Sequence, residues 1–137
     1  MAREILFKAK GISDGKWVEG LLTIMWGQYH IINPNDENTA YPIDTDTICQ
    51  YTGLTDKNGN KIWENDVVKY KNADGIKFNG TTLTVIGKVV YNEKTASFAV
   101  YGKDEIGGKH CDYFPIKNVE VIGNIFDNPD LLEEKHE

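Results

Sequence analysis

The hairpin that decides the fold is TTLTVIGKVVYNEKTASFAVY, which occupies residues 81–101. Valine, isoleucine and threonine dominate its first half, 81–91, and β-branched residues of this kind are typical of strands. The polar Asn-Glu-Lys-Thr segment that follows supplies the chemistry of a turn. After the turn, alternation places Ala96, Phe98 and Val100 on one face of a returning strand. The stretch therefore predicts a long antiparallel hairpin.

The composition favours β structure along the whole chain of 137 residues. Valine, isoleucine and threonine supply 33 residues, against 13 for leucine and alanine together, and stiff β-branched side chains suit pleated sheets. A chain of this length buries roughly two-thirds of its unfolded surface, which is enough for one core or two small ones. We therefore expect a mostly β protein.

Before the hairpin, turn residues divide the chain into short strands at the spacing typical of sandwiches and barrels. A three-stranded meander followed by a polar loop and a short extended piece is expected, with its extended parts at residues 5–10, 17–25, 29–32 and 41–43. In the second of these strands Val18, Leu22 and Ile24 share one face. This meander and loop make up an expected first domain, 1–50.

The rest of the chain predicts a small SH3-like β-barrel over residues 51–127. Asn58 and Gly59 are expected to give a tight hairpin turn its positive φ angles. The strands expected around the main hairpin and this turn lie at 54–56, 61–63, 67–70, 111–114 and 119–126. Residues 128–137 form an acidic tail, in which Asn128 and Pro129 favour the start of a short helix over 128–135. We expect the N-terminal β-meander to pack on the barrel.

The same three residues, Val-Ile-Gly, occur at 85–87 and again at 121–123. Each copy places a glycine inside an expected strand. Glycine in such a position marks a bulge, a bend or a close approach of two backbones. We interpret both glycines as structural, because no phosphate-binding spacing of glycines accompanies them.

The net charge is −6, and most of it comes from the acidic C-terminal tail. No segment has a basic excess larger than a single charge, so the charge pattern does not favour a generic nucleic-acid-binding protein. No apolar run has the length of a membrane span, and the first residues lack the pattern of a signal peptide. A cytoplasmic location away from membranes is therefore expected, with Cys49 and Cys111 reduced.

Three blocks of the sequence carry a resemblance to a known family. They are REILFKAK at 3–10 with GKWVEG at 15–20, QYTGLTDKNGNKIWE at 50–64, and VIGNIFDNP at 121–129. In this order they resemble the YopX family of phage and prophage proteins. Asn65 departs from the glycine of the family pattern, but asparagine also tolerates positive φ. The resemblance implies a small β-rich protein of a bacteriophage or prophage in the bacterial cytoplasm, and it brings no catalytic residues with it.

Residue patterns that would indicate catalysis or metal binding are incomplete. Asp56, Asn58 and Asn60 match the start of a calcium loop, but the required glycine and glutamate are missing at the later positions. The triplet at 110–112, His-Cys-Asp, would point its side chains to alternating faces of a strand. No local pattern activates Cys49 toward a histidine such as His30. We therefore expect no catalytic residue, no metal and no cofactor.

Binding is the function that the sequence favours. We expect a non-catalytic accessory protein that binds a phage or host protein or a second copy of itself, with a symmetric homodimer or higher assembly. Two alternatives stay open, a nucleic-acid-binding small barrel and an enzyme of unrecognised class. The candidate interaction surface consists of Trp63, Lys69, Tyr70, Lys71, Lys88 and Tyr91, and Lys77 could join its lysines.

Overall fold

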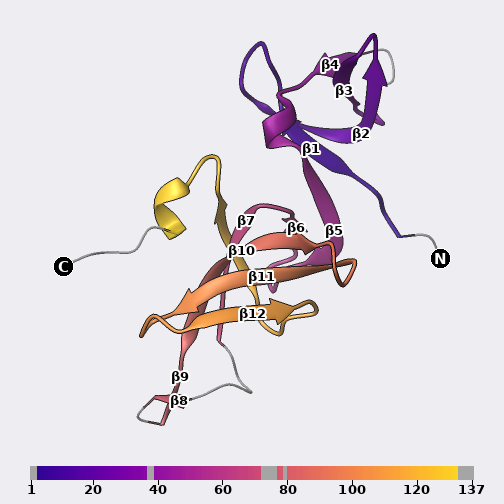
Figure 1. The fold of residues 1–137 in the computed structure, drawn as a ribbon. Helices are drawn as coiled ribbons and strands as arrows, with labels where there is room; N and C mark the ends of the chain where they lie inside the picture. The colour runs from indigo at the N-terminus through magenta and orange to yellow at the C-terminus, as the bar shows by residue number, and fades with distance from the viewer. Residues whose placement is uncertain (1–2, 37–38, 72–76, 79, 133–137) are drawn as a thin grey trace. The chain divides into compact units, whose positions relative to one another are not determined.

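The structure, a computed structural model, describes residues 3–36, 39–71, 77–78 and 80–132 (Figure 1). The chain folds into two compact units, Met1–Gly53 and Leu54–Glu137, and each is described by itself. The structure is mostly β, as the composition predicts. The boundary expected after residue 50 falls inside strand β5 (Cys49–Thr55), which begins in the first unit and ends in the second.

The first unit is an antiparallel sheet in the order β4-β3-β2-β1-β5. Its strands before β5 are β1 (Phe7–Lys10), β2 (Trp17–Met25), β3 (Gln28–Ile32) and β4 (Ala40–Pro42), and the 3₁₀ turn η1 (Thr45–Thr47) precedes β5. The meander expected at this end of the chain is therefore present. Ala9, Ile31 and Ile43 are fully buried at its core. Val18 and Leu22 pack against this core, whereas Ile24, on the same strand, is 58% exposed.

The three tryptophans of the chain lie in different environments. Trp26 forms the β2–β3 turn with Gly27, both at positive φ (51° and 75°), and its side chain is 94% exposed. Trp17 lies beneath two lysines of β1, with the Nζ of Lys8 4.6 Å from the ring centroid and that of Lys10 5.4 Å away. Trp63, in the second unit, is buried. The three tryptophans thus range from almost fully exposed to buried.

The second unit is built on a five-stranded antiparallel sheet in the order β12-β11-β10-β7-β13. Its elements are β6 (Lys61–Trp63), β7 (Asp66–Lys71), β8 (Lys77–Phe78), β9 (Thr81–Thr82), β10 (Thr84–Asn92), β11 (Ser97–Asp104), β12 (Lys109–Tyr113), β13 (Glu120–Asn124) and the 3₁₀ turn η2 (Pro129–Leu132). β8 pairs with β9 in a separate two-stranded sheet, and β6 pairs with the end of β5. β10 is the central strand of the main sheet, and β7 lies between β10 and the edge strand β13 (Figure 1).

The predicted long hairpin is β10 and β11, with two corrections. Leu83 separates β9 from β10, so the strand expected over 81–91 is interrupted. Asn92 is paired with Ser97 and the turn covers 93–96, one residue later than expected. Ala96 lies in that turn at φ 52° and not on the strand face with Phe98. The side chain of Asn92 accepts the Lys94 N–H at 3.0 Å, which stabilises the later turn.

One face of this sheet forms the core of the second unit. Val68, Val85, Val89 and Val100 are fully buried there and form a cluster with other apolar residues, among them Ile62, Tyr70 and Val119. Opposite strands approach closely at Gly87, where an added Cβ would lie 2.5 Å from the carbonyl oxygen of Tyr101. At the other Val-Ile-Gly copy, Gly123 follows a register shift between β13 and β7. The structural interpretation of both glycines is confirmed.

The described strands form open sheets and no closed barrel. The expected SH3-like barrel therefore stays a prediction. At the C-terminal end the described part is a single 3₁₀ turn, η2. The remainder of the helix expected over 128–135 lies outside the described residues.

The turn at Asn58 and Gly59 is present, but only Gly59 has a positive φ, of 84°. Gly59 donates its N–H to the Asp56 carbonyl at 3.0 Å, and the Asp56 N–H bonds to the Asn60 carbonyl at 2.8 Å. This is a type I turn followed by a left-handed residue, a common three-residue hairpin loop. Asn65 adopts φ 71° in the next turn, as expected for asparagine in place of glycine.

Candidate functional site

The side of the five-stranded sheet opposite the valine core carries tyrosine and lysine side chains, together with the buried Val67 and Ala99. Lys88 of β10 pairs with Tyr101 of β11, which in turn pairs with Cys111 of β12. Side chains directly opposite each other in antiparallel strands lie on the same face, and alternate residues along a strand share it. The tyrosine–lysine face defined in this way comprises Lys69, Lys71, Lys88, Tyr101, Lys103, Lys109, Cys111 and Tyr113.

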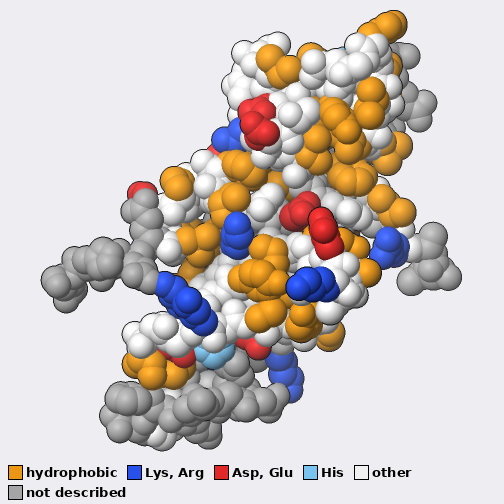
Figure 2. Space-filling view, in the orientation of Figure 1, with side chains coloured by type: hydrophobic (Ala, Val, Ile, Leu, Met, Phe, Trp, Pro, Cys, Tyr) orange, Lys and Arg blue, Asp and Glu red, His pale blue; other side chains and the backbone are white. Residues whose placement is uncertain are grey.

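A groove of about 890 Å³ crosses this face. Lys88, Tyr101, Lys103 and Lys109 line it together with Ile86 from β10 and the two leucines of η2. Lysine and hydrophobic side chains are interspersed over this unit in the space-filling view (Figure 2). The groove thus combines apolar surface with several cationic groups.

Tyr101 and Tyr113 are held in place by one amide. The Nδ2 of Asn92 donates to the phenolic oxygen of Tyr113 at 2.9 Å and to that of Tyr101 at 3.3 Å. The two residues are 43% and 45% exposed, so their rings remain open to a ligand. Burial of the hydroxyl and the neighbouring Cys111 and Tyr113 raise the pKa of Tyr101 above its usual value of 10.0. Tyr101 is therefore neutral at physiological pH.

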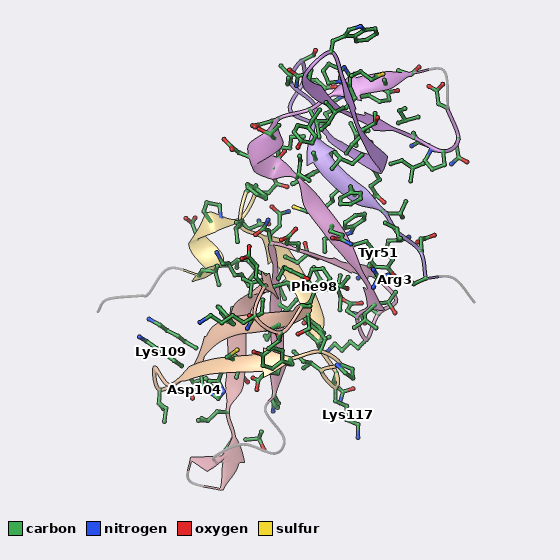
Figure 3. The ribbon with its side chains drawn as sticks, turned by 45° about the vertical axis from the view of Figure 1, so that its right-hand side comes forward. Arg3, Tyr51, Phe98, Asp104, Lys109 and Lys117 are labelled. Atoms are coloured by element: carbon green, nitrogen blue, oxygen red, sulfur yellow. The ribbon has the colours of Figure 1, made fainter. Side chains whose placement is uncertain are left out.

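Two acidic residues, Asp104 and Glu105, also line the groove, and both are engaged in hydrogen bonds. Glu105 Oε1 accepts the N–H of Thr84 at 2.6 Å. Asp104 Oδ1 accepts the N–H groups of Ile106 at 3.0 Å and Gly108 at 2.8 Å. Figure 3 shows Asp104 and Lys109 at the same end of the β11–β12 hairpin. The Asp104 carboxylate thus stabilises the turn between β11 and β12, and the Glu105 carboxylate joins this turn to the start of β10.

A polar chain lies on the opposite, core-facing side of the same strands. His110 Nε2 lies 2.8 Å from Asp104 Oδ2, and His110 Nδ1 lies 3.9 Å from Asp112 Oδ2. The buried Tyr70 donates its hydroxyl to Asp112. Burial, followed by the bond to Asp112, raises the pKa of Tyr70 well above its usual range. The bond to His110 is the largest of the effects that hold the pKa of Asp104 below its usual value.

The structure separates the six residues of the expected interaction surface. Lys69, Lys71 and Lys88 do share the tyrosine–lysine face. Trp63 and Tyr70 are buried, at 5% and 4% exposure, so neither belongs to a binding surface. The alternation of side chains along β7 explains why Tyr70 is buried, because it lies between Lys69 and Lys71, which face the opposite side of the sheet.

Tyr91 is exposed, but it lies on the core-facing side of the sheet, where it pairs with Phe98. The ring centroids of the two residues are 5.4 Å apart, with an interplanar angle of 71°. The side chain of Lys77 lies outside the described residues. Sequence reasoning missed Tyr101 and Tyr113, although alternation from Phe98 and Val100 already placed Tyr101 on the opposite side of its strand.

Cys49 and His30, the pair that the sequence analysis considered, lie on different strands and have other partners. Cys49 is buried and donates to the carbonyl of Thr47 at 3.2 Å. His30 Nδ1 lies 2.8 Å from the carbonyl of Gln28, and two strands separate β3 from β5. Within the described ranges, no three His, Cys, Asp or Glu residues are grouped so that they could hold a metal ion.

Asp56, the first residue of the incomplete calcium pattern, acts as a hydrogen-bond acceptor inside the second unit. Its Oδ1 accepts the N–H groups of Asn58 and Asn60, both at 2.9 Å, and its Oδ2 accepts that of Val121 at 2.9 Å. Burial would raise the pKa of this carboxyl, but the bonds from Val121, Asn60 and Asn58 lower it below its usual value. The hairpin-turn interpretation of this segment is confirmed.

These features define an all-β protein with an exposed aromatic and basic sheet face. In the part of the chain that the structure describes, no helix has the length and apolar character needed to cross a membrane. The family model described as YopX protein matches residues 7–133, so the chain belongs to the YopX family. None of the curated proteins matches the sequence.

Proposed function

We propose that this chain is a binding protein without catalytic activity and that its tyrosine–lysine face binds single-stranded nucleic acid. The observation that carries the proposal is a sheet face with two exposed tyrosine rings, on which one of them, Tyr101, lines a groove together with three lysines. The setting implied by the resemblance, a bacteriophage or prophage protein in the bacterial cytoplasm, forms part of the proposal.

Stacking of unpaired bases is the chemistry that Tyr101 and Tyr113 suit. Exposed aromatic rings bind bases with little sequence preference, because every base has a π face. The shared bond to Asn92 fixes both rings, so less side-chain freedom is lost on binding. A duplex hides its base faces, so the proposal favours single strands over duplexes.

Lys88, Lys103 and Lys109 would contact the phosphates. Lysine contacts to phosphate release counterions, and this makes affinity fall as the salt concentration rises. The chain carries a net charge of −6, which opposes approach of a polyanion. We therefore expect modest affinity, on the order of 1–100 μM, as for other non-specific binding.

Fluorescence anisotropy with a labelled single-stranded oligonucleotide tests the proposal. The protein is titrated into oligo-dT and oligo-U at low salt, with a duplex of the same length as a control. Binding to single strands that weakens as salt rises is the expected result. Absence of binding to both single strands at low salt would reject the proposal and favour the protein partner that the sequence analysis preferred.

Variants locate the binding surface. Y101A and Y113A should each weaken binding about fivefold or more, because losing one stacked base costs at least about 1 kcal/mol. Y91A is the matched control, because Tyr91 is 44% exposed on the other side of the sheet. Equal losses for Tyr91 and Tyr101 would contradict the assignment to this face.

Lysine variants test the phosphate contacts. K88Q and K109Q should each reduce the slope of log affinity against log salt by about 1. K117Q is the control, because Lys117 lies beyond the other end of β12 (Figure 3). An unchanged slope in both groove variants would remove these lysines from the interface.

A further inference from the structure

The second unit presents one regular edge strand, β12. Of the strands described, β12 and β13 end the five-stranded sheet. β13 is irregular, because its pairing with β7 shifts register between Val121 and Gly123. β12 pairs with β11 over five consecutive residues without a shift. A regular edge strand offers a row of backbone groups to another strand.

The hydrogen bonds of β12 show which of its backbone groups point outward. Phe114 donates its N–H to the Phe98 carbonyl at 3.3 Å, and Asp104 donates to the Gly108 carbonyl at 2.9 Å. In an antiparallel ladder, residues on one strand alternate between bonding the neighbour and pointing away from it. The even-numbered residues of β12 therefore bond β11. Lys109, Cys111 and Tyr113 direct their N–H and C=O groups to the free side of the strand.

The side chains of β12 are complementary to themselves about Cys111. If two copies of the strand pair antiparallel with Cys111 opposite Cys111, each Lys109 lies opposite a Tyr113 of the other copy. Lysine over a tyrosine ring is a favourable cation–π contact. On the core-facing side, each His110 then lies opposite an Asp112, a cross-strand pair of an imidazole and a carboxylate, which are complementary as hydrogen-bond donor and acceptor.

We propose that β12 pairs antiparallel with β12 of a second copy of this chain, with Cys111 at the two-fold axis. The outward groups of Lys109, Cys111 and Tyr113 form the new ladder, and the result is a continuous ten-stranded sheet. Charged residues on an edge strand usually prevent such pairing. In the proposed register no like charges lie opposite each other, whereas a shift by two residues would place His110 opposite His110 or Asp112 opposite Asp112, so the side chains of β12 favour this register.

The dimer goes beyond the proposed function and does not depend on it. The two-fold axis is perpendicular to the sheet, so both tyrosine–lysine faces lie on the same side of the joined sheet. The Cys111 thiols, exposed in the single chain, come face to face at the centre. Hydrogen-bonded antiparallel pairs have Cα atoms about 5.5 Å apart. A short bismaleimide would therefore link the two thiols.

Light scattering and cross-linking, both without nucleic acid, test the dimer. The mass should rise from 15.5 kDa to twice that value with concentration, and the bismaleimide should give a covalent dimer. C111S should still dimerise but lose the cross-link, because Cys49 is buried. C111K should lower the association constant of the dimer about fivefold, since like charges would meet at the axis.

T95K is the control, because it adds one charge at an exposed turn away from β12. Circular dichroism and the melting temperature of C111K check that the exposed substitution leaves the fold intact. A monomer at all concentrations overturns the proposal. A dimer that neither cross-links at Cys111 nor responds to C111K also overturns it.

Discussion

The loops that begin at Asp56 and Asp104 share one backbone design but differ in their third partner. In each loop the aspartate Oδ1 accepts the N–H groups two and four residues later, and a glycine follows at φ 84° or 85°. At Asp56 the other oxygen accepts a backbone N–H, that of Val121. At Asp104 it is bonded to a side chain, His110.

The difference separates a loop that joins distant parts of the sheet from one that stays local. Val121 lies 65 residues from Asp56 along the chain, whereas His110 lies only six from Asp104. A backbone N–H has no alternative orientation, while the His110 ring also lies near Asp112. The same sequence pattern, Asp followed by Gly three residues later, thus holds β13 in one place and positions a histidine in the other.

Of the changes proposed for the two loops, removal of the Asp56 carboxylate should lower the free energy of unfolding the most. D56A leaves the N–H groups of Asn58, Asn60 and Val121 without their acceptor, and we expect a loss of about 3 kcal/mol in the free energy of unfolding. Urea denaturation measures it. D104A should lose less, because its loop closes only neighbouring strands. Equal losses of unfolding free energy in D56A and D104A would show that the partner of the second carboxylate oxygen, Val121 or His110, does not affect stability.

Valine at the two loop glycines tests whether the backbones are equivalent. G59V and G107V place a β-branched residue at positive φ, which costs about 1–2 kcal/mol. An added Cβ meets nothing within 4 Å at either glycine, so the cost arises from the backbone alone. G59N is the control, since asparagine tolerates this conformation. Melting temperatures that drop at only one glycine would contradict the shared design.

Acid should weaken both loops. The pKa values of Asp56 and Asp104 are held below their usual value of 3.8 in the folded chain. Their contribution to stability is therefore complete above that value and is lost as the pH falls through the lowered folded pKa. Urea midpoints at pH 5, 4 and 3 should fall more steeply for the wild type than for D56N or D104N. Parallel curves for all three proteins would exclude these carboxylates as the source.

The smallest effect is expected at His110. H110Q removes the third partner of one loop only, and the free energy of unfolding should change by about 1 kcal/mol or less. The backbone amide shifts of Ile106 and Gly108 should move, while those of Asn58 and Asn60 should not. Changes in the amide shifts of both loops would mean that the two loops are coupled.

Local patterns in the sequence predicted the strands well and the tyrosine–lysine face only in part. The β10–β11 hairpin and the turn at Gly59 follow from β-branched runs and an Asn-Gly pair, which are interactions between near neighbours. The later turn at Ala96 could not be foreseen, because alanine rarely adopts positive φ and the choice depends on the pairing of whole strands.

The candidate face shows the same limit. Lys69, Lys71 and Lys88 could be placed on a strand surface from their spacing. The burial of Trp63 and Tyr70, and the meeting of Tyr101 with Tyr113, depend on which side of the sheet packs against the core. Which side packs against the core depends on tertiary contacts, and neither the composition nor the alternation of residues along a strand reveals these contacts.

The separate environments of the three tryptophans make the chain its own fluorescent reporter. Trp63 is buried in the second unit, so its emission should shift when that unit unfolds. Trp17 lies beneath two lysines in the first unit, and Trp26 is nearly as exposed in the fold as in an unfolded chain. Replacing Trp26 with phenylalanine would leave one informative indole in each unit, so that the unfolding of each could be followed in the intact protein.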